Sequence, residues 1–361
     1  MLKKINAVVW LRRDLRLHDH RPLQEAVLDG KHVQHVFVFD TKILDSLTNK
    51  QDRRVEFIHE SIVALEKELV GLGGSLVVLY GDPVKVIPDF CKDHAISAVY
   101  VGRDQDPYGV ERDGKVLGAL THLGVQWHSC DDHTVVAPTQ ALQPTGKPYV
   151  VFTPYFNRWR SVLQNYLQDA SVSLSDVAWL NIAGSVPTLH AMGFSSVLNT
   201  AISGEGGERQ AQKRWSFFKA QRIEDYLETR DYPSVHSTSG LSVHFRFGTI
   251  AARQCVREVF GLAHEEGVLT WIKEIAWRDF YAQLLYHFPK TIQEPFQTRY
   301  DTLLWSTDAS LFKAWATGKT GYPLVDAAQR QLVSTGFMHN RLRMVSASFS
   351  SKHLGLDWRI G

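Results

Sequence analysis

The sequence is poor in cysteine and has no long apolar run. Three cysteines in 361 residues, odd in number and far apart, exclude a disulfide framework and a cysteine metal site, and we interpret them as buried thiols: Cys91, Cys130 and Cys255. No apolar stretch reaches the length of a membrane span, and the run that follows the basic start is too short for a secretory signal. We therefore predict a cytoplasmic protein that has no membrane partner.

Net charge is also nearly absent, at +2, but it is unevenly placed. Residues 1–200 carry 20 basic and 22 acidic side chains, whereas residues 201–361 carry 20 basic and 16 acidic ones. This basic excess favours a polyanionic partner for the C-terminal part, although charged side chains more often cover a solvated face. The ten tryptophans and eighteen phenylalanines are a surplus that is typical of flat ligands or thick cores.

The first third of the chain alternates apolar runs with segments of helical spacing. Between the second and third runs, apolar residues recur every three or four positions from Val55 to Leu69, which predicts one apolar helix face. This alternation predicts an α/β domain with a doubly wound parallel sheet. The five predicted strands are Ala7–Leu11, Val33–Asp40, Ser75–Tyr80, Ala98–Val101 and Val125–His128.

The turn after the first predicted strand lacks the glycines of a dinucleotide-binding loop. It reads RRDLRLHDH (12–20), and GLGG (71–74) precedes a strand instead of following one, so we predict no standard dinucleotide site here. Residues 131–207 are interrupted by proline and glycine and then become rich in serine, alanine and glycine, which indicates a connector. Helical spacing dominates from Glu208 onward. We therefore predict three parts: an α/β domain (1–130), a connector (131–207) and an all-α domain (208–361).

The segment WIKEIAWRDFY (271–281) predicts a helix with polar chemistry among aromatic rings. At 100° per residue, Trp271, Glu274 and Arg278 fall on one face, with Trp277 and Tyr281 beside it. A face that carries rings, a carboxylate and a guanidinium suits a planar polar ligand. The alternative is an internal ion pair between Glu274 and Arg278 at i,i+4, flanked by packed rings.

The segment TGFMHNRLRMVSASF (335–349) predicts a second helix with two different sides. The side that is expected to pack consists of Met338, Leu342, Val345 and Phe349. The opposite side consists of Asn340, Arg343, Met344 and Ala347. An amide, a guanidinium and a thioether on one side favour a helix that lines a cofactor or substrate cavity. The alternative is a side that faces solvent.

The third candidate is HSTSGLS (236–242). Its consecutive hydroxyls and glycine precede an apolar-periodic stretch, so they are suited to cap a helix. The same free N–H groups at a helix start can bind phosphate. Capping is the commoner meaning, and phosphate binding gains weight only together with the other two segments.

Six segments of the chain follow one another in an order that is hard to obtain by chance. They are VVWLRRDLRLHDH (8–20), KPYVVFTPYFNRW (147–159), TSGLSVHFRFGTI (238–250), WIKEIAWRDFY (271–281), GKTGYPLVDAAQRQL (318–332) and TGFMHNRLRMVSASF (335–349). Together they resemble the DNA photolyase/cryptochrome family, most closely its class I cyclobutane pyrimidine dimer photolyases. The resemblance implies an N-terminal α/β domain that carries an antenna chromophore, and an all-α C-terminal domain that holds FAD beside a flipped-out lesion.

The resemblance also implies site residues, matched motif by motif. Those similar to FAD contacts are Tyr226, Thr238, Ser239, Leu241, Ser242, Trp271, Glu274, Arg278, Asn340 and Arg343. Those similar to DNA and lesion contacts are Arg230, Glu274, Trp277, Arg278, Tyr281, Asn340, Arg341 and Met344. Trp305 and Trp358 resemble the outer members of a tryptophan electron-transfer chain, and we assign them to catalysis with Glu274 and Asn340.

The implied reaction is light-driven repair, in which reduced FAD donates an electron to a cyclobutane pyrimidine dimer in DNA, and the dimer splits and returns it. Glu274 would stabilise the dimer radical by hydrogen bonding, and Trp277 offers a stacking plane for an extruded base. The alternatives are a cryptochrome-type blue-light photoreceptor and an inactive truncated fragment. The antenna is a folate or a deazaflavin, near Asp104, Asp106 and Tyr108. We expect a monomer.

The sequence departs from the family pattern in three places. Gly240 stands where the family usually has an arginine, which removes a phosphate contact, and Phe337 stands at a frequent tryptophan position. The chain ends at Gly361, before a segment that in relatives supplies an asparagine near the flavin, the acidic partner of the residue matched by Arg343, and the flavin-nearest tryptophan. We therefore expect an incomplete C-terminal domain, weak FAD binding and little repair from residues 1–361.

Overall fold

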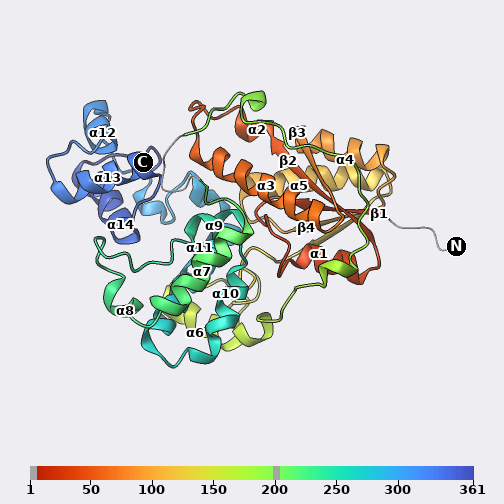
Figure 1. The fold of residues 1–361 in the computed structure, drawn as a ribbon. Coiled ribbons are helices and arrows are strands. Elements are labelled where there is room, and N and C mark those ends of the chain that lie inside the picture. Colours follow the sequence, from red (N-terminus) through yellow and green to blue (C-terminus); the bar gives the residue numbers. More distant parts are fainter. Residues whose placement is uncertain (1–5, 198–203) are drawn as a thin grey trace.

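A five-stranded parallel sheet forms the first part of the fold (Figure 1). The computed structural model describes residues 6–197 and 204–361. Its strands are β1 (Asn6–Leu11), β2 (His32–Asp40), β3 (Leu76–Gly81), β4 (Ala98–Gly102) and β5 (Gln126–Cys130), in the order β3-β2-β1-β4-β5. The chain winds outward in both directions from β1, so the predicted doubly wound sheet is confirmed.

Helices cover both faces of this sheet because β1 alternates its side chains between two cores. Ala7, Val9 and Leu11 pack with α1 (Arg21–Leu28) and α3 (Arg53–Gly71). Val8 and Trp10 pack with α4 (Pro83–Asp93) and α5 (Pro107–His122). The predicted apolar face from Val55 to Leu69 is confirmed in α3. Helices α2 (Thr41–Leu44), α3, α4 and α5 each begin after an aspartate that accepts a hydrogen bond from the amide two residues on: Asp40, Asp52, Asp82 and Asp106.

The predicted connector contributes to two cores. Helix α6 (Phe152–Val162) buries Tyr155, Phe156 and Trp159 in the core of the helical part. Further along, Val177, Met192 and Phe194 pack back onto the sheet side. The described part of 131–207 therefore joins the two cores by belonging to both, and the three-part division of the chain stays a prediction.

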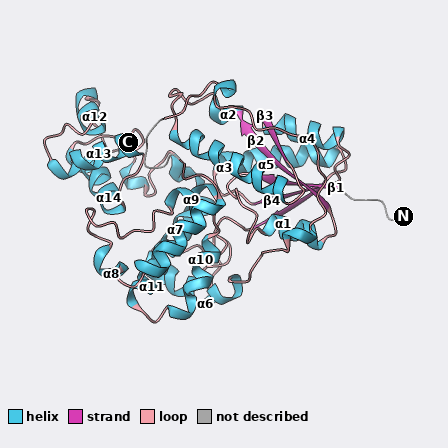
Figure 2. Cartoon of the chain, viewed as in Figure 1, coloured by secondary structure: helices cyan, strands magenta, loops and turns pink. Residues whose placement is uncertain are grey.

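The helical part centres on α11 (Glu266–His287), which packs with α6, α7 (Glu208–Gln221), α8 (Tyr226–Thr229) and α10 (Ala252–Val259). Helix α9 (Ser242–Phe247) packs against α3, where His244 and Phe247 contact the ring of Phe57. The helices α12 (Ala309–Ala316), α13 (Pro323–Thr335) and α14 (Asn340–Ser348), which a π-helical turn (Phe349–His353) extends, form a group away from the sheet (Figure 1). Figure 2 shows that the strands gather in one region, flanked by helices, and that the rest of the chain consists of helices and loops. Within the described ranges, the helices are too short or too polar to span a bilayer.

The turn RRDLRLHDH joins the sheet to the helical part through buried ion pairs. Arg16 Nη2 lies 2.5 Å from Asp132 Oδ2, and Arg253 Nη2 lies 2.5 Å from Asp19 Oδ1. Arg257 of α10 contacts the other oxygen of Asp19 at 2.8 Å. We call these five residues the interdomain ion network. The turn that lacks phosphate-binding glycines therefore serves to hold two parts of the protein together.

The three cysteines are unpaired. Cys91 and Cys255 are buried as predicted, and burial raises the pKa of Cys91 to about 12. The expectation was wrong for Cys130, which is only half-buried because β5 lies at the edge of the sheet.

Candidate functional site

The central helix α11 carries five of the predicted site residues, but it does not pair Glu274 with Arg278. Glu274 Oε1 accepts a hydrogen bond from Arg230 Nη1 at 2.5 Å. Arg278 donates instead to the carbonyl oxygens of His133, at 2.7 Å, and Phe245, at 3.1 Å. The alternative of an internal i,i+4 ion pair is therefore wrong, because both side chains find partners on other elements.

Trp271 lies in an aromatic cluster inside the helical core. Its ring is 2% exposed and stacks on Trp215, with centroids 4.9 Å apart, and it also contacts Phe218. Tyr226, at the start of α8, meets Phe218 edge-on at 5.7 Å. This cluster packs the buried side of α11 and thereby positions the residues on its exposed side. The cofactor contacts of Trp271 and Tyr226 stay predictions.

Trp277 forms an aromatic stack near the surface. Phe152, the first residue of α6, lies parallel to the indole at a centroid distance of 3.6 Å and an interplanar angle of 6°. Tyr281, one turn further along α11, lies 5.7 Å away at 24° and is 62% exposed. The stack fixes the plane of Trp277, and Phe152 covers one face of its indole. Sequence reasoning missed Phe152 because its partner is more than a hundred residues away.

A chain of ion pairs runs from Glu274 to the start of α14. Arg230, which pairs with Glu274, has its Nε 3.6 Å from Asp231 Oδ1. The same oxygen of Asp231 lies 2.5 Å from Arg341 Nη2. Four charged side chains from α11, the end of α8 and α14 are thus joined, and Met344 lies beside Arg341 at 3.8 Å. Asp231 was not among the predicted site residues. Its only signal is its place next to Arg230.

The segment 236–242 begins a helix without capping it. Helix α9 starts at Ser242, and its N-cap is Leu241, which offers no side-chain hydrogen bond. The capping interpretation is therefore wrong, because the helix begins three residues after Ser239, the last of the consecutive hydroxyls, and the buried Leu241 stands at the N-cap. Gly240 has a φ of +66°, and a Cβ built there would lie 2.9 Å from Arg214 Nη1. Arg214 thus brings a guanidinium to the place where the sequence lacks an arginine.

Helix α14 has the two predicted sides. Met338, Leu342 and Phe349 are buried, which confirms the packing side. Asn340, Arg343, Met344 and Ala347 are exposed. Arg343 Nε donates to the Met338 carbonyl at 3.0 Å, and His339 caps the helix by accepting from the Arg341 amide. Because this side is open in the structure, its role in lining a cavity stays a prediction.

The segments that contain Trp305 and Trp358 lie side by side. An isolated parallel bridge pairs Ser306 with Leu356, and the Ser306 amide donates to the Gly355 carbonyl at 2.7 Å. Trp358 is 39% exposed and Trp305 is half-buried. The two tryptophans thus lie at the surface on neighbouring segments, and their place in an electron-transfer chain stays a prediction.

The predicted antenna residues lie at the carboxyl ends of β2 and β4. Asp104 contacts Arg13 at 3.3 Å and Arg112 at 3.5 Å, and Tyr108 donates to Asp40 at the end of β2. Asp106 caps α5 and lies 3.5 Å from Arg13. This edge is where open parallel sheets bind ligands. The carboxylates there are already paired with arginines, so a ligand would have to exchange places with side chains.

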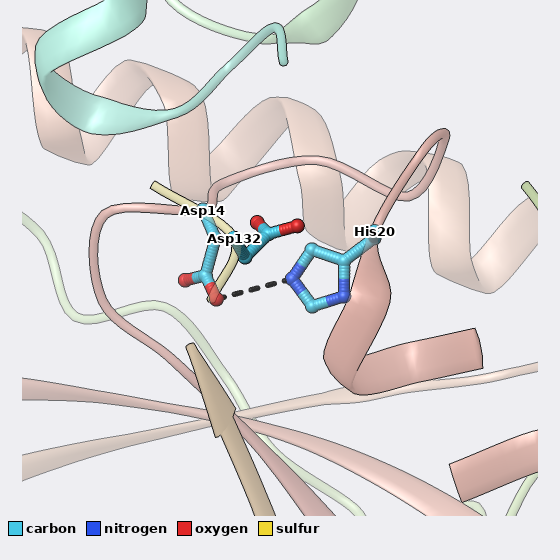
Figure 3. A group of neighbouring side chains, drawn as sticks. All are labelled: Asp14, His20 and Asp132. Carbon is cyan, nitrogen blue, oxygen red and sulfur yellow. Dashed lines mark ion pairs between the residues drawn. The ribbon is translucent and has the colours of Figure 1, made fainter. Parts of the chain in front are cut away.

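The side chains of three buried residues lie close enough together to hold a metal ion (Figure 3). They are Asp14, His20 and Asp132, and one potential ligand atom of each lies within 4.8 Å of the other two. His20 Nε2 is 3.2 Å from Asp14 Oδ2. Burial would raise the pKa of Asp14, but the neighbouring His20 outweighs it and the pKa lies below its ordinary value. Asp132 is paired with Arg16, so a cation here would compete with a guanidinium. The group is best explained as an extension of the interdomain ion network, which it joins through Asp132.

Asp279 of α11 provides a pH-dependent test of the structure. Its Oδ2 accepts three hydrogen bonds, each 3.0 Å long, from the amides of Val135 and Val136 and the indole of Trp159. Burial nevertheless raises the pKa of Asp279 to about 6. A raised carboxyl pKa contributes stability that is complete below the unfolded pKa of about 4 and is lost as the pH rises through 6.

We expect the unfolding free energy of the wild type, relative to Asp279→Asn, to increase by about 1 kcal/mol when the pH falls from 7 to 5. Urea titrations of both proteins at the two pH values measure this change, and the variant removes the contribution of all other titrating groups. A difference between the two proteins that does not depend on pH would contradict the raised pKa of Asp279.

Comparison with known proteins connects these features to a family. Residues 7–173 match the family model described as DNA photolyase, and residues 271–361 match the one described as FAD binding domain of DNA photolyase. The chain is 35% identical over 368 residues to the deoxyribodipyrimidine photo-lyase of Synechococcus sp., which covers 98% of this chain and 75% of that relative. A protein of the same name from Thermus thermophilus is 35% identical over 355 residues, with 98% and 77% covered.

Two solved structures share the fold. A class III photolyase from Agrobacterium tumefaciens has a TM-score of 0.88 and 31% identity, over 100% of this chain and 75% of that chain. A Synechocystis cryptochrome has a TM-score of 0.86 and 27% identity, over 100% and 78%. The chain thus spans about three quarters of the length of these proteins. The assignment to class I stays a prediction, but the sequence matches and the fold agree that the chain belongs to the DNA photolyase/cryptochrome family.

Proposed function

We propose that this protein repairs cyclobutane pyrimidine dimers in DNA in a light-driven reaction that uses FAD. The observation that carries the proposal is the cluster around α11, where Glu274 and Trp277 lie beside the linked pair Arg230 and Arg341, in a chain with relatives named deoxyribodipyrimidine photo-lyase. An aromatic platform beside a carboxylate and two cations suits an extruded base and its flanking phosphates.

The residues around Gly240 are suited to the phosphates of FAD. The guanidinium of Arg214, which lies against Gly240 and pairs with Glu205 at 2.7 Å, forms a polar group there together with the preceding hydroxyls. The residues that we propose to hold FAD are Tyr226, Thr238, Ser239, Leu241, Ser242, Trp271, Glu274, Arg278, Asn340 and Arg343, with Arg214 added. When bound, FAD supplies the absorption of light and the transferable electron.

The remaining side chains would bind and position the DNA. Trp277 stacks on the extruded dimer, Glu274 hydrogen-bonds to it, and Arg230 and Arg341 bind phosphates. We assign Tyr281, Asn340 and Met344 to the rim of the same surface. Trp305 and Trp358 would form the outer path along which an electron reaches the site.

We also propose four further features that the sequence predicts. These are the division into 1–130, 131–207 and 208–361, a cytoplasmic location, a monomeric state, and a folate or deazaflavin antenna near Asp104, Asp106 and Tyr108. The ion pairs of Asp104 with arginines support the antenna site only in part, because they supply charged groups at the sheet edge but occupy the same carboxylates.

The proposal predicts salt-sensitive binding to damaged DNA and repair in light. A titration with FAD, followed by absorption, first gives the concentration at which the protein is loaded. At that concentration we expect tighter binding to a duplex with one dimer than to the undamaged duplex, weakening for both as salt rises because phosphate contacts release counterions. Illumination should remove the dimer, although we expect residues 1–361 to repair only a small part of it, and a dark sample is the control. Equal affinity for both duplexes, together with no repair, would overturn the proposal.

A cryptochrome-type photoreceptor is the second candidate, favoured by the likeness to the Synechocystis structure. Such a protein would keep the FAD and tryptophan sites but would need no lesion pocket. The same binding measurement separates the two functions, because a photoreceptor that does not repair DNA has no reason to prefer the duplex with a dimer.

A further inference from the structure

Asp231 lies between two arginines that the proposed function assigns to DNA. Its Oδ1 is 2.5 Å from Arg341 Nη2 and 3.6 Å from Arg230 Nε. The side chain of Asp231 is 52% exposed and that of Arg341 is 38% exposed, so a ligand can reach both side chains. Asp231 therefore joins the end of α8 to the start of α14 by accepting a charged hydrogen bond from Arg341.

A carboxylate in this position resembles a phosphate to the two arginines. Both anions accept hydrogen bonds from guanidinium groups in the same fork geometry, so a phosphate that approaches Arg341 must compete with Asp231. Exposed ion pairs contribute little to stability, typically about 0–1 kcal/mol. The main effect of Asp231 should therefore fall on binding rather than on the fold.

We propose that Asp231 is a specificity-determining residue, which holds Arg230 and Arg341 in fixed positions and competes with the phosphates of undamaged DNA. The inference rests on the proposed function. Binding to undamaged DNA depends almost entirely on phosphate contacts, whereas binding to a dimer also uses the stacking on Trp277. Arginine side chains that are released from Asp231 can adapt to the phosphates of any DNA backbone, whereas arginines that Asp231 holds suit one arrangement of phosphates. The carboxylate therefore acts against the binding of undamaged DNA.

The test is Asp231→Asn, with Kd measured for undamaged and dimer-containing duplexes at several salt concentrations. We expect the variant to bind undamaged duplex about threefold more tightly at low salt, with a steeper salt dependence, and its preference for the dimer to fall by a similar factor. Asp225→Asn is the matched control, because it makes the same charge change six residues earlier, in an acidic hollow lined by Glu224 and Glu228. Asp231→Glu keeps the charge and should behave like the wild type.

Equal effects of Asp231→Asn and Asp225→Asn would overturn the inference, because net charge alone would then explain them. A proportional loss of affinity for both duplexes with a lowered Tm would also overturn it, since Asp231 would then be structural. If the wild type binds both duplexes equally, the proposed function fails instead. In that case, tighter binding by Asp231→Asn but not by Asp225→Asn would still support competition with phosphate.

Discussion

Replacing Arg253 by methionine is expected to lower the free energy of unfolding by about 3–5 kcal/mol. The Arg253 side chain is 1% exposed, and its guanidinium contacts Asp19 at 2.5 Å and Asp132 at 3.5 Å. Methionine fills a similar volume but leaves the Asp19 carboxylate, which is equally buried, with Arg257 as its remaining cationic partner in the interdomain ion network. A buried carboxylate with too little positive charge around it is costly in a medium of low dielectric.

Urea unfolding, followed by tryptophan fluorescence and by circular dichroism, measures this loss. The two probes should also separate in the variant, because the network joins the sheet to the helical part and its loss lets the two unfold more independently. Arg209→Met is the control, since Arg209 is exposed on α7 and should change stability by less than about 0.5 kcal/mol. If both variants lose the same small amount, the network does not hold the two parts together.

Replacing Trp277 by alanine should weaken binding to dimer-containing DNA by about 1–3 kcal/mol, or roughly 5- to 150-fold in Kd. The expectation follows from the indole plane that Phe152 fixes at 3.6 Å, since a base that stacks on alanine gains no such contact. Affinity for undamaged duplex should change little, because that binding depends on phosphates. FAD binding should be retained, since Trp271 and Tyr226 form the inner cluster without Trp277.

Fluorescence anisotropy with both duplexes and a flavin titration give the three quantities needed. Tyr286→Ala is the matched control, because Tyr286 is an exposed aromatic residue on the same helix outside the stack on Phe152. Loss of FAD with unchanged DNA affinity in the Trp277 variant would move this residue from the lesion surface to the cofactor shell. Equal losses from both tyrosine and tryptophan variants would indicate a general effect on α11.

The sheet could be predicted because its information is local. Each strand is a short apolar run between turn residues, and the helix from Val55 to Leu69 shows its buried face in its own spacing. The two-sided character of α14 follows from the same kind of period. These predictions need no knowledge of partners, because burial on one side is written in successive residues.

The site could be predicted only where a motif named its residues. Spacing shows that Glu274 and Arg278 are able to pair. It does not show that Arg230 lies close enough to form the ion pair with Glu274 instead. The stack of Phe152 on Trp277 and the bridge of Asp231 to Arg341 join residues 125 and 110 positions apart, and nothing local specifies them. The hydroxyls before α9 do not cap it because the helix begins at Ser242, three residues after Ser239.

The interdomain ion network also sets an order of assembly during synthesis. Arg16 and Asp132 are 116 residues apart, so both have been made once the sheet is complete, whereas Asp19 waits for Arg253, 234 residues later. Contacts between residues so far apart in the sequence form slowly, because a long loop must be ordered before the contact can stabilise the fold. Until α10 has left the ribosome, Asp19, in the turn after β1, lacks its final partner, because Arg253 has not yet been made. The first part of the chain to be made is therefore among the last to become fully stable.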